Sequence, residues 1–378
     1  SKDVLNWLFK TSPNPKAPRT AIGLMSGTSL DGLDACLVQE VDSSRIEVIR
    51  TLSTPLSESL RTSLLSIIES GTTSLSDLLS VESEYTDQVI AQCQILIESS
   101  ETPIAVIGFH GQTIWHAPEI GSTLQIGLAE RLAEQTKTPV AYQFRRGDMA
   151  RGGQGAPLAP LFHDIHFRRE TENVAVLNLG GIANLSLLIP GQHTTGWDLG
   201  PANTLSDTWH QMHQQMPFDR DGAFAASGTV HETLLTQLLS DPYFVKEAPK
   251  STGREYFSKT WLEQALHQLP PIDPADVQAT LNQLTAELVN KALPDDIDIL
   301  VVCGGGIHNA HLMDAIDDAI DPLMVTSEAF SIDPDFVEAA CFGWLGLKSL
   351  DDTALPTRTI TGSDKPGVLG TIIKPATD

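Results

Sequence analysis

The amino-acid sequence predicts an α/β protein made of two related halves with a ligand-binding cleft between them. An apolar strand, a glycine-containing turn and a second apolar strand occur at residues 21–38, and the same pattern returns at residues 173–191. Apolar residues at helical spacing occupy much of the chain between and after these units. A pattern that occurs twice indicates two similar halves, although two unrelated hairpins could look alike.

The composition narrows the class of protein. A chain of 378 residues favours two domains, and 41% apolar with 19% charged residues is typical of a globular protein. No apolar run approaches the ~18 residues of a membrane span, and residues 1–10 lack the apolar core of a signal peptide. A net charge of −24 argues against nucleic acid as a partner. We therefore expect a cytoplasmic protein without a membrane or nucleic-acid partner.

The four cysteines are scattered along the chain without metal-binding spacing, so we expect reduced core residues and no disulfide. Residues 1–20 contain three prolines among polar residues and are expected to form a flexible extension. A first domain over residues 21–170 and a second over residues 171–378 follow. The strand-like segment 368–373 could return to the first domain.

The turn after the first strand has the composition of a phosphate-binding loop. Its glycines let the backbone approach a ligand, and its hydroxyl groups can donate to phosphate oxygens. Asp31 and Asp34 lie where the Mg²⁺ of a nucleotide would bind. An ordinary hairpin turn would look similar, so this turn alone does not establish phosphate binding. The glycine and hydroxyl residues concerned are Ser26, Gly27, Thr28, Ser29 and Gly32.

Helical spacing predicts helices at residues 56–69 and 74–98, and a buried strand follows at residues 104–108. We expect a polar loop after this strand, facing the cleft, because ligands bind beyond the carboxyl ends of strands in open α/β sheets. A purely structural role for its histidines is equally reasonable. The polar residues of this loop are His110, Gln112, Thr113 and His116.

A strand near residues 123–127, a helix at residues 128–135 and a strand at residues 139–144 precede a long segment without periodicity, residues 145–160. Long irregular segments are usually functional or disordered. The mixture of arginines, four glycines, Asp148 and Gln154 favours a functional loop. The densest basic cluster of the chain also lies here, at Arg145, Arg146 and Arg151.

In the second half, the repeated turn carries Asn178, Gly180, Gly181 and Asn184. A short strand is then predicted to end at Asp198, and a turn through residues 200–201 leads into a helix capped near residue 203. A carboxylate at a strand end facing the cleft suits a general base, although a cap or turn former would look the same.

Further helices are predicted at residues 222–239, 258–268 and 276–293, with the polar run 249–258 as a plausible loop near a ligand. A buried strand then leads into a triple glycine and a helix from about His308. This arrangement suits a nucleotide-contacting turn. It is not the dinucleotide fingerprint, because Asn309 stands where that pattern requires glycine. The glycines are Gly304, Gly305 and Gly306.

The last predicted elements are a strand at residues 323–327 and a helix with Asp333 at its N-cap and Pro334 in its first turn. Glu338 lies one turn into this helix.

Three glycine turns, one opening each half and one late in the second, resemble the layout of the actin-like ATPase and sugar kinase superfamily, in which nucleotide lies between two similar domains. Eight short strings go further: GTSLDGLD, HGQT, RGDMARGGQGAPL, NLGGIANL, WDLGPAN, PKSTGREYF, GGGIHN and PDFVEAACF. Each is weak alone, but together they resemble the anhydro-N-acetylmuramic acid kinase family.

This resemblance implies two actin-like domains and the ATP-dependent conversion of 1,6-anhydro-N-acetylmuramic acid to N-acetylmuramic acid 6-phosphate, with Mg²⁺, in a homodimer. Asp198 would be the general base. The implied nucleotide contacts are Gly27, Thr28, Ser29, Leu30, Asp31, Gly32, Leu33, Asp34, Asn178, Gly180, Gly181, Asn184, Gly304, Gly305, Gly306 and Asn309. The expected sugar contacts are His110, Gln112, Thr113, Asp148 and Glu338. The Arg145 region could offset the lactyl carboxylate.

The sequence departs from the family pattern at two places. Ala202 stands where a second glycine is typical, and the last helix reads FGWLG where FAWLA is usual. Three other functions stay open: a kinase for a sugar with a free hydroxyl, a chaperone-like or filament-forming ATPase, and a nucleotide-binding regulator without catalysis.

Overall fold

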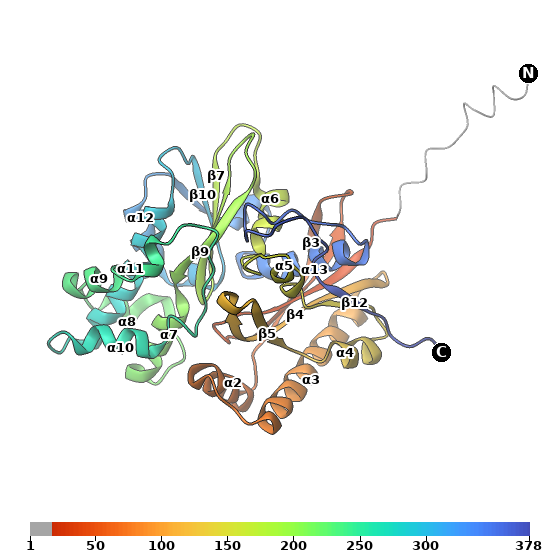
Figure 1. The fold of residues 1–378 in the computed structure, drawn as a ribbon, viewed down its shortest axis with the longest axis horizontal. Helices are drawn as coiled ribbons and strands as arrows, with labels where there is room; N and C mark the ends of the chain where they lie inside the picture. The colour runs from red at the N-terminus through yellow and green to blue at the C-terminus, as the bar shows by residue number, and fades with distance from the viewer. Residues whose placement is uncertain (1–16) are drawn as a thin grey trace, which may run out of the picture.

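The computed structural model describes residues 17–378, so most of the predicted extension at residues 1–20 lies outside the described residues. Figure 1 shows two α/β lobes side by side, each built on its own sheet. Within the described part, the first sheet has the order β12-β6-β4-β1-β2-β3, with β5 paired to β4, and the second has the order β11-β10-β7-β8-β9. The predicted two-part α/β architecture is confirmed.

The first sheet is covered on one face by three helices, α2 (Glu58–Ser70), α3 (Leu75–Ser99) and α4 (Ala129–Thr136). Ser57 and Ser74 cap the first two helices through their hydroxyl groups, and both helices lie where the sequence predicted them. The strands of this sheet are β1 (Thr20–Ser26), β2 (Leu33–Glu40), β3 (Ile46–Thr54), β4 (Ile104–Ala117), β5 (Ser122–Ile126), β6 (Val140–Tyr142) and β12 (Thr371–Ile373).

Strand β4 corrects the prediction of a polar loop after residue 108. It continues to Ala117 and forms a hairpin with β5, so His110, Gln112 and His116 lie on a strand. These side chains are buried, which composition alone does not anticipate, because each finds a hydrogen-bond partner. Strand β3 was not predicted, since it is an edge strand with largely exposed polar residues.

The second lobe is drawn from residues 174–326. Its helices are α7 (Asn203–Gln214), α8 (Ala223–Ala226), α9 (Glu232–Leu239), α10 (Lys259–His267), α11 (Pro274–Ala292) and α12 (Ala310–Ala319). Its strands are β7 (Val174–Leu179), β8 (Ile182–Leu188), β9 (Thr195–Pro201), β10 (Ile299–Cys303) and β11 (Leu323–Thr326). Short 3₁₀ turns occur in the second lobe at η2 (Arg220–Gly222), η3 (Pro242–Val245) and η4 (Gly305–His308), and elsewhere at η1 (Pro118–Ile120), η5 (Ser327–Phe330) and η6 (Pro334–Phe336).

Two helix predictions in this lobe need correction. The segment predicted as one helix at residues 222–239 contains two, α8 and α9. Between them the chain packs on α11, and a Cβ atom at Gly228 would lie 2.1 Å from the Ala275 carbonyl oxygen. The helix predicted to be capped near Asn203 begins at that residue. Its N-cap is Ala202, and the Asn203 amide instead donates to the Leu179 carbonyl at 3.1 Å.

The other face of the first sheet is covered by α13 (Val337–Leu350), which comes from the second half of the sequence. A core of buried residues from both sheets, α13 and α6 (Ala159–Phe167) joins the lobes. The chain end also joins the first lobe, since β12 pairs antiparallel with β6. The segment 145–160, predicted to be irregular, contains the short helix α5 (Arg146–Ala150).

Helix α13 packs directly on the strand backbones. A Cβ atom at Gly23 would lie 1.8 Å from the Ala339 carbonyl oxygen, and one at Gly108 would lie 1.9 Å from the Phe342 carbonyl oxygen. Gly343 and Gly346 of α13 face the same two strand positions. The glycines in the FGWLG string therefore lie at the closest approach between helix and sheet.

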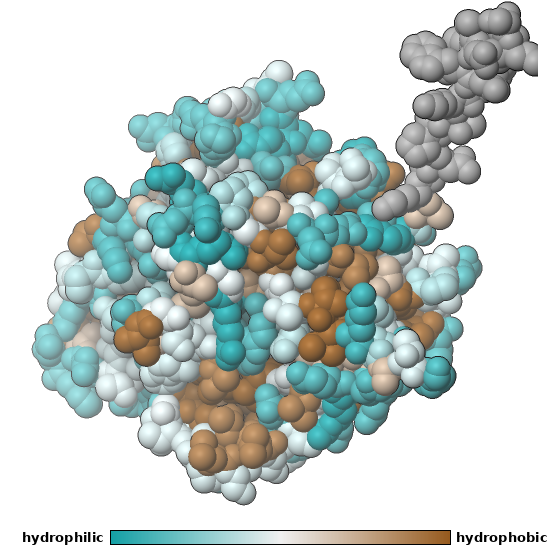
Figure 2. Space-filling model, turned by 45° about the vertical axis from the view of Figure 1, so that its right-hand side comes forward, coloured by the Kyte–Doolittle hydropathy of each residue, from teal (hydrophilic) through white to brown (hydrophobic). Residues whose placement is uncertain are grey.

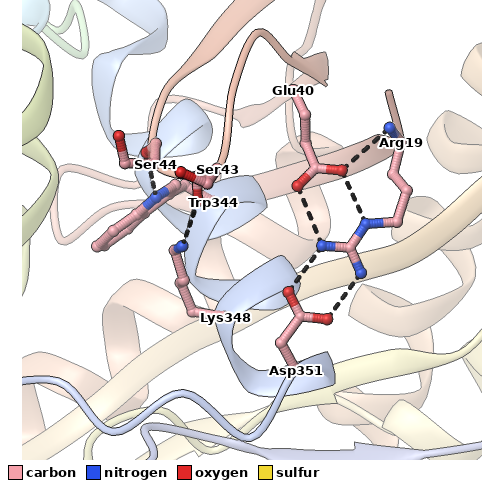
Figure 3. A network of polar contacts seen from close by, with 7 residues as sticks. All are labelled: Arg19, Glu40, Ser43, Ser44, Trp344, Lys348 and Asp351. Carbon is pink, nitrogen blue, oxygen red and sulfur yellow. Dashed lines mark hydrogen bonds and ion pairs between the residues drawn. The ribbon is translucent and has the colours of Figure 1, made fainter. Parts of the chain in front are cut away.

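The start of β1 is tied to the end of α13 (Figure 3). The Arg19 guanidinium donates to the carboxylates of Glu40 and Asp351 at 2.7–3.0 Å. In the same region, Trp344 and Lys348 of α13 donate to main-chain oxygens of the turn between β2 and β3. These contacts fix the helix along the sheet.

The surface is mostly hydrophilic on the face shown in Figure 2, with apolar residues gathered in separate patches. Within residues 17–378, no helix has the length and apolar character to cross a membrane. All four cysteines are buried and unpaired, as predicted.

We predict that Gly23→Ala lowers the free energy of unfolding by about 3 kcal/mol, because the added methyl group cannot fit against Ala339. Gly27→Ala is the matched control, since a Cβ there meets nothing within 4 Å. Urea unfolding of both variants gives the comparison. Equal stability of the two variants would contradict the close packing.

We predict that Arg19→Met lowers the free energy of unfolding by about 1–2 kcal/mol, because two carboxylates lose their shared cation. Arg45→Met removes a more exposed pair with Asp42 and should lower the free energy of unfolding less than Arg19→Met does. Unfolding in urea gives the free energy of unfolding of both variants. A smaller loss for Arg19 than for Arg45 would show that the network does not fix α13.

Candidate active site

A cavity of about 530 Å³ lies between the two lobes, and all three glycine turns line it. The sequence therefore identified turns that the fold brings to one place. The predicted site residues in its lining are Gly27, Thr28, Ser29, Asp31, Gly32, Asp34, His110, Thr113, Asn178, Gly180, Gly181, Asn184, Asp198, Gly304, Gly305, Gly306, Asn309 and Glu338. Leu30, Leu33, Gln112 and Asp148 lie outside this lining.

The turn between β1 and β2 is anchored by side chains that point away from the cavity. Leu30 has a positive φ of 58° and, like Leu33, is buried in the core of the first lobe. Gln112 donates to the Gly27 carbonyl at 3.3 Å from behind the turn. These three residues support the turn, and any nucleotide contact by the leucines would use their main chain.

At two positions in the turns, neighbouring atoms lie so close that only glycine fits. A Cβ at Gly181 would lie 2.2 Å from the Thr28 hydroxyl oxygen, so the opening turns of the two lobes touch. Gly304 has a φ of 89°, and a Cβ there would lie 2.6 Å from the Asn178 amide oxygen. Only glycine therefore allows these turns to pack together as they line the cavity.

The Asp148 side chain lies inside the protein, where it holds two segments together. Its carboxylate accepts hydrogen bonds from Thr357, Thr361 and the Gly155 amide at 2.6–2.8 Å and is fully buried. These bonds hold the loop after α5 against the C-terminal segment. The structure gives this carboxylate no position in the cavity lining, in contrast to the sugar contact expected from the resemblance.

Asp198 lies within β9 and not at its end, because the strand continues to Pro201. Its carboxylate faces the cavity and accepts a hydrogen bond from the Thr252 amide at 3.0 Å. Burial raises the pKa of Asp198 to about 7, while the Thr252 amide and the positive charge of Arg145 oppose this rise. A carboxylate with such a pKa can accept a proton near neutral pH.

Asn184 is the cross-strand partner of Asp198, so its side chain lies on the same face of the sheet. It also lines the cavity. Its amide oxygen is buried without a hydrogen-bond partner among the described residues. The structure thus places Asn184 beside the carboxylate, on β8, and not in the turn where the sequence put it.

Arg145 lines the cavity and contacts His110 on β4. It donates to His110 Nε2 at 3.0 Å and to the Gly155 carbonyl at 2.9 Å. Burial, with a further contribution from Arg145, lowers the pKa of His110 to about 3, so this ring is neutral and its Nδ1 donates to the Gly111 carbonyl. Glu338 accepts a hydrogen bond from Asn178, and burial raises the pKa of its carboxyl group.

The loop at residues 249–258, expected to lie near a ligand, supplies residues that sequence reasoning did not single out. Thr252 and Glu255 line the cavity, and burial raises the pKa of Glu255 to about 7. Ser251 hydrogen-bonds His116 at 3.0 Å and donates to Gln154 at 3.1 Å, which links the two lobes. The polar composition of the run was the available signal, but it does not say which side chain turns inward.

The carboxylates proposed for a metal, Asp31 and Asp34, both line the cavity near the first turn. Ser53 donates to Asp34, and burial raises the pKa of Asp34 to about 6. No group of three or more metal-ligating side chains occurs within residues 17–378. Mg²⁺ bound with a nucleotide commonly uses one or two carboxylates, with phosphates and water completing its shell, so this donor set fits.

Comparison with known proteins gives a consistent picture. The sequence model of the family described as anhydro-N-acetylmuramic acid kinase matches residues 19–375. A protein of that name from Pseudomonas syringae pv. tomato is 42% identical over 358 residues, which cover 93% of this chain and 98% of the relative. One from Pseudomonas fluorescens is 43% identical with the same coverage.

Among solved structures, a ROK family glucokinase from Streptomyces griseus in complex with glucose and AMPPNP aligns with 12% identity and a TM-score of 0.40, covering 87% of this chain and 99% of that one.

We predict that Arg145→Met raises the pKa of Asp198 above its value of about 7 by about one unit, because a nearby positive charge is lost. Less of the carboxylate is then deprotonated at neutral pH. NMR titration of protein carrying ¹³Cγ-labelled aspartate, assigned with Asp198→Asn, measures this. Arg151→Met is the control, since Arg151 does not line the cavity, and an equal shift in both variants would contradict the assignment.

Proposed function

The chain belongs to the anhydro-N-acetylmuramic acid kinase family, and we propose that its cleft converts 1,6-anhydro-N-acetylmuramic acid and ATP to N-acetylmuramic acid 6-phosphate and ADP. The observation that carries this proposal is the position of Asp198, a buried carboxylate in a cavity that the phosphate-type turns of both lobes also line. The product would re-enter amino-sugar metabolism from peptidoglycan turnover.

The substrate requires hydrolysis and phosphorylation together. Its O6 is tied to C1 in an internal acetal, so no free hydroxyl is available at that position. Water attacks C1 and the C1–O6 bond breaks, while O6 forms a bond to the γ-phosphorus and the bond from that phosphorus to ADP breaks. Asp198 takes the proton that the water loses.

Asp198 and Asn184 are suited to hold the attacking water. Asp198 can accept its proton, since burial has brought the pKa of this carboxyl group near neutrality. The unpartnered amide oxygen of Asn184 can accept the second hydrogen. The pair would orient the water before the bond to C1 forms.

The glycine turns are assigned to ATP. Main-chain N–H groups near Gly27 and Gly181 would donate to phosphate oxygens, and the turn at Gly304 would lie against the nucleoside. Mg²⁺ held by Asp31 or Asp34 would neutralise charge on the phosphates.

On the sugar side, His110, Thr113, Glu338 and Glu255 are available in the cavity lining. Arg145, which also lines it, supplies a positive charge toward the lactyl carboxylate. We propose a cytoplasmic enzyme that acts as a homodimer, a state that light scattering of the purified protein would test.

A kinase for a sugar with a free hydroxyl is the alternative, in which Asp198 would deprotonate that hydroxyl directly. Turnover in ¹⁸O-labelled water distinguishes the two reactions by mass spectrometry of the product. Coupled hydrolysis places the label at C1. Product without label at C1 would rule out the proposed reaction.

We predict that Asp198→Asn lowers kcat for sugar-dependent ATP turnover by about 10²–10⁴-fold, because the proton acceptor is lost. Nucleotide affinity should change little, since the turns are untouched. An ADP-release assay and calorimetry measure the two quantities. Asp164→Asn, a change at a surface pair with Arg168, is the control and should retain activity.

A further inference from the structure

One loop of the second lobe contacts both the proposed base and the first phosphate turn. We call residues 249–257 the bracing loop. The Thr252 amide donates to the Asp198 carboxylate at 3.0 Å, and Arg254, two residues later, donates to the Thr28 carbonyl at 2.7 Å. Thr28 belongs to the first lobe, so the loop spans the cleft between the lobes.

The Arg254 side chain is only 6% exposed, although it carries a charge. Besides Thr28, it donates to the Thr208 hydroxyl on α7 at 3.2 Å, and Glu69 on α2 lies 3.9 Å away. Burial lowers the pKa of this guanidinium group, and neighbouring carboxylates, including Asp207, oppose the change. A buried cation with fixed partners on both lobes is held in one position.

The ends of the bracing loop are fixed as well. Lys250 donates to the Tyr243 carbonyl, and the Tyr243 hydroxyl donates to the main-chain oxygen of Asp198. Phe257 is fully buried and stacks on Phe244 in the core of the second lobe. Thr252 and Arg254 therefore lie between two anchored ends, with one residue between them.

We propose that Arg254 is a positioning residue that couples the base to the first phosphate turn, so that occupation of the sugar side sets the position of the main chain that holds the ATP phosphates. This inference rests on the proposed function. Arg254 lies outside the cavity lining, so it acts through Thr28 and not by touching either substrate.

The test compares Arg254→Met, which keeps length but removes every donor, with Arg254→Lys. Arg131→Met is the matched control, because Arg131 is a partly buried arginine with Ser83 and Asp87 as partners inside the first lobe. Calorimetry gives the Kd of a non-hydrolysable ATP analogue with and without the anhydro sugar. Steady-state kinetics gives kcat and both KM values.

In the wild type and in Arg131→Met, we expect the sugar to tighten analogue binding at least ~5-fold. In Arg254→Met this ratio should fall to about 1 and kcat should drop about 10²-fold, with KM for the sugar nearly unchanged. Arg254→Lys keeps the charge but replaces two donor nitrogens with a single ammonium nitrogen, so both values should lie between those of Arg254→Met and the wild type.

The inference would be overturned if Arg254→Met kept the wild-type kcat and the wild-type effect of the sugar on analogue binding. It would also be overturned if the sugar did not change analogue binding in the wild type. If Arg254→Met does not fold, Arg254→Lys decides, and unchanged coupling in that variant would also overturn the inference. A wild type without sugar-dependent turnover would instead contradict the proposed function, so the two failures are distinguishable.

Discussion

The contact on which the rest of the structure depends is the one between α13 and the first sheet. Gly23 and Gly108 let helix and strand backbones meet, because no Cβ atom fits between them. This approach places Glu338, near the start of α13, within hydrogen-bonding distance of Asn178 in the second lobe. The position of one helix thus sets both the core between the lobes and one wall of the cleft.

The sequence allowed the glycine turns and most helices to be predicted, because local patterns mark them. It drew attention to Asp198 through a predicted strand end, although the strand continues to Pro201. It did not reveal that β4 continues through His110, since the partners that bury this residue come from distant segments. The same limit applies to Asp148, because its two hydroxyl donors, Thr357 and Thr361, lie about two hundred residues later. Arg254 was not singled out within the polar run 249–258, because only the folded chain brings Thr28 to it.

The cleft combines buried charges of both signs in a strongly acidic protein. Arg145 and Arg254 lie among carboxylates that burial drives toward protonation, including Asp198 and Glu255. The net charge of −24 therefore says little about the site, because an enclosed cation such as Arg145 acts over a short distance in a weakly polar environment. Anionic substrates can be accommodated without a basic surface.

The crossing of α13 and β12 back to the first sheet also bears on how the chain folds during synthesis. One core of the second lobe uses residues 175–320, a continuous stretch. The second core is shared, because residues of both sheets, including Val106 and Val176, are buried together with α13. Domains usually complete themselves in N-to-C order on the ribosome, whereas here neither lobe can close this shared core before residues 337–350 have been made.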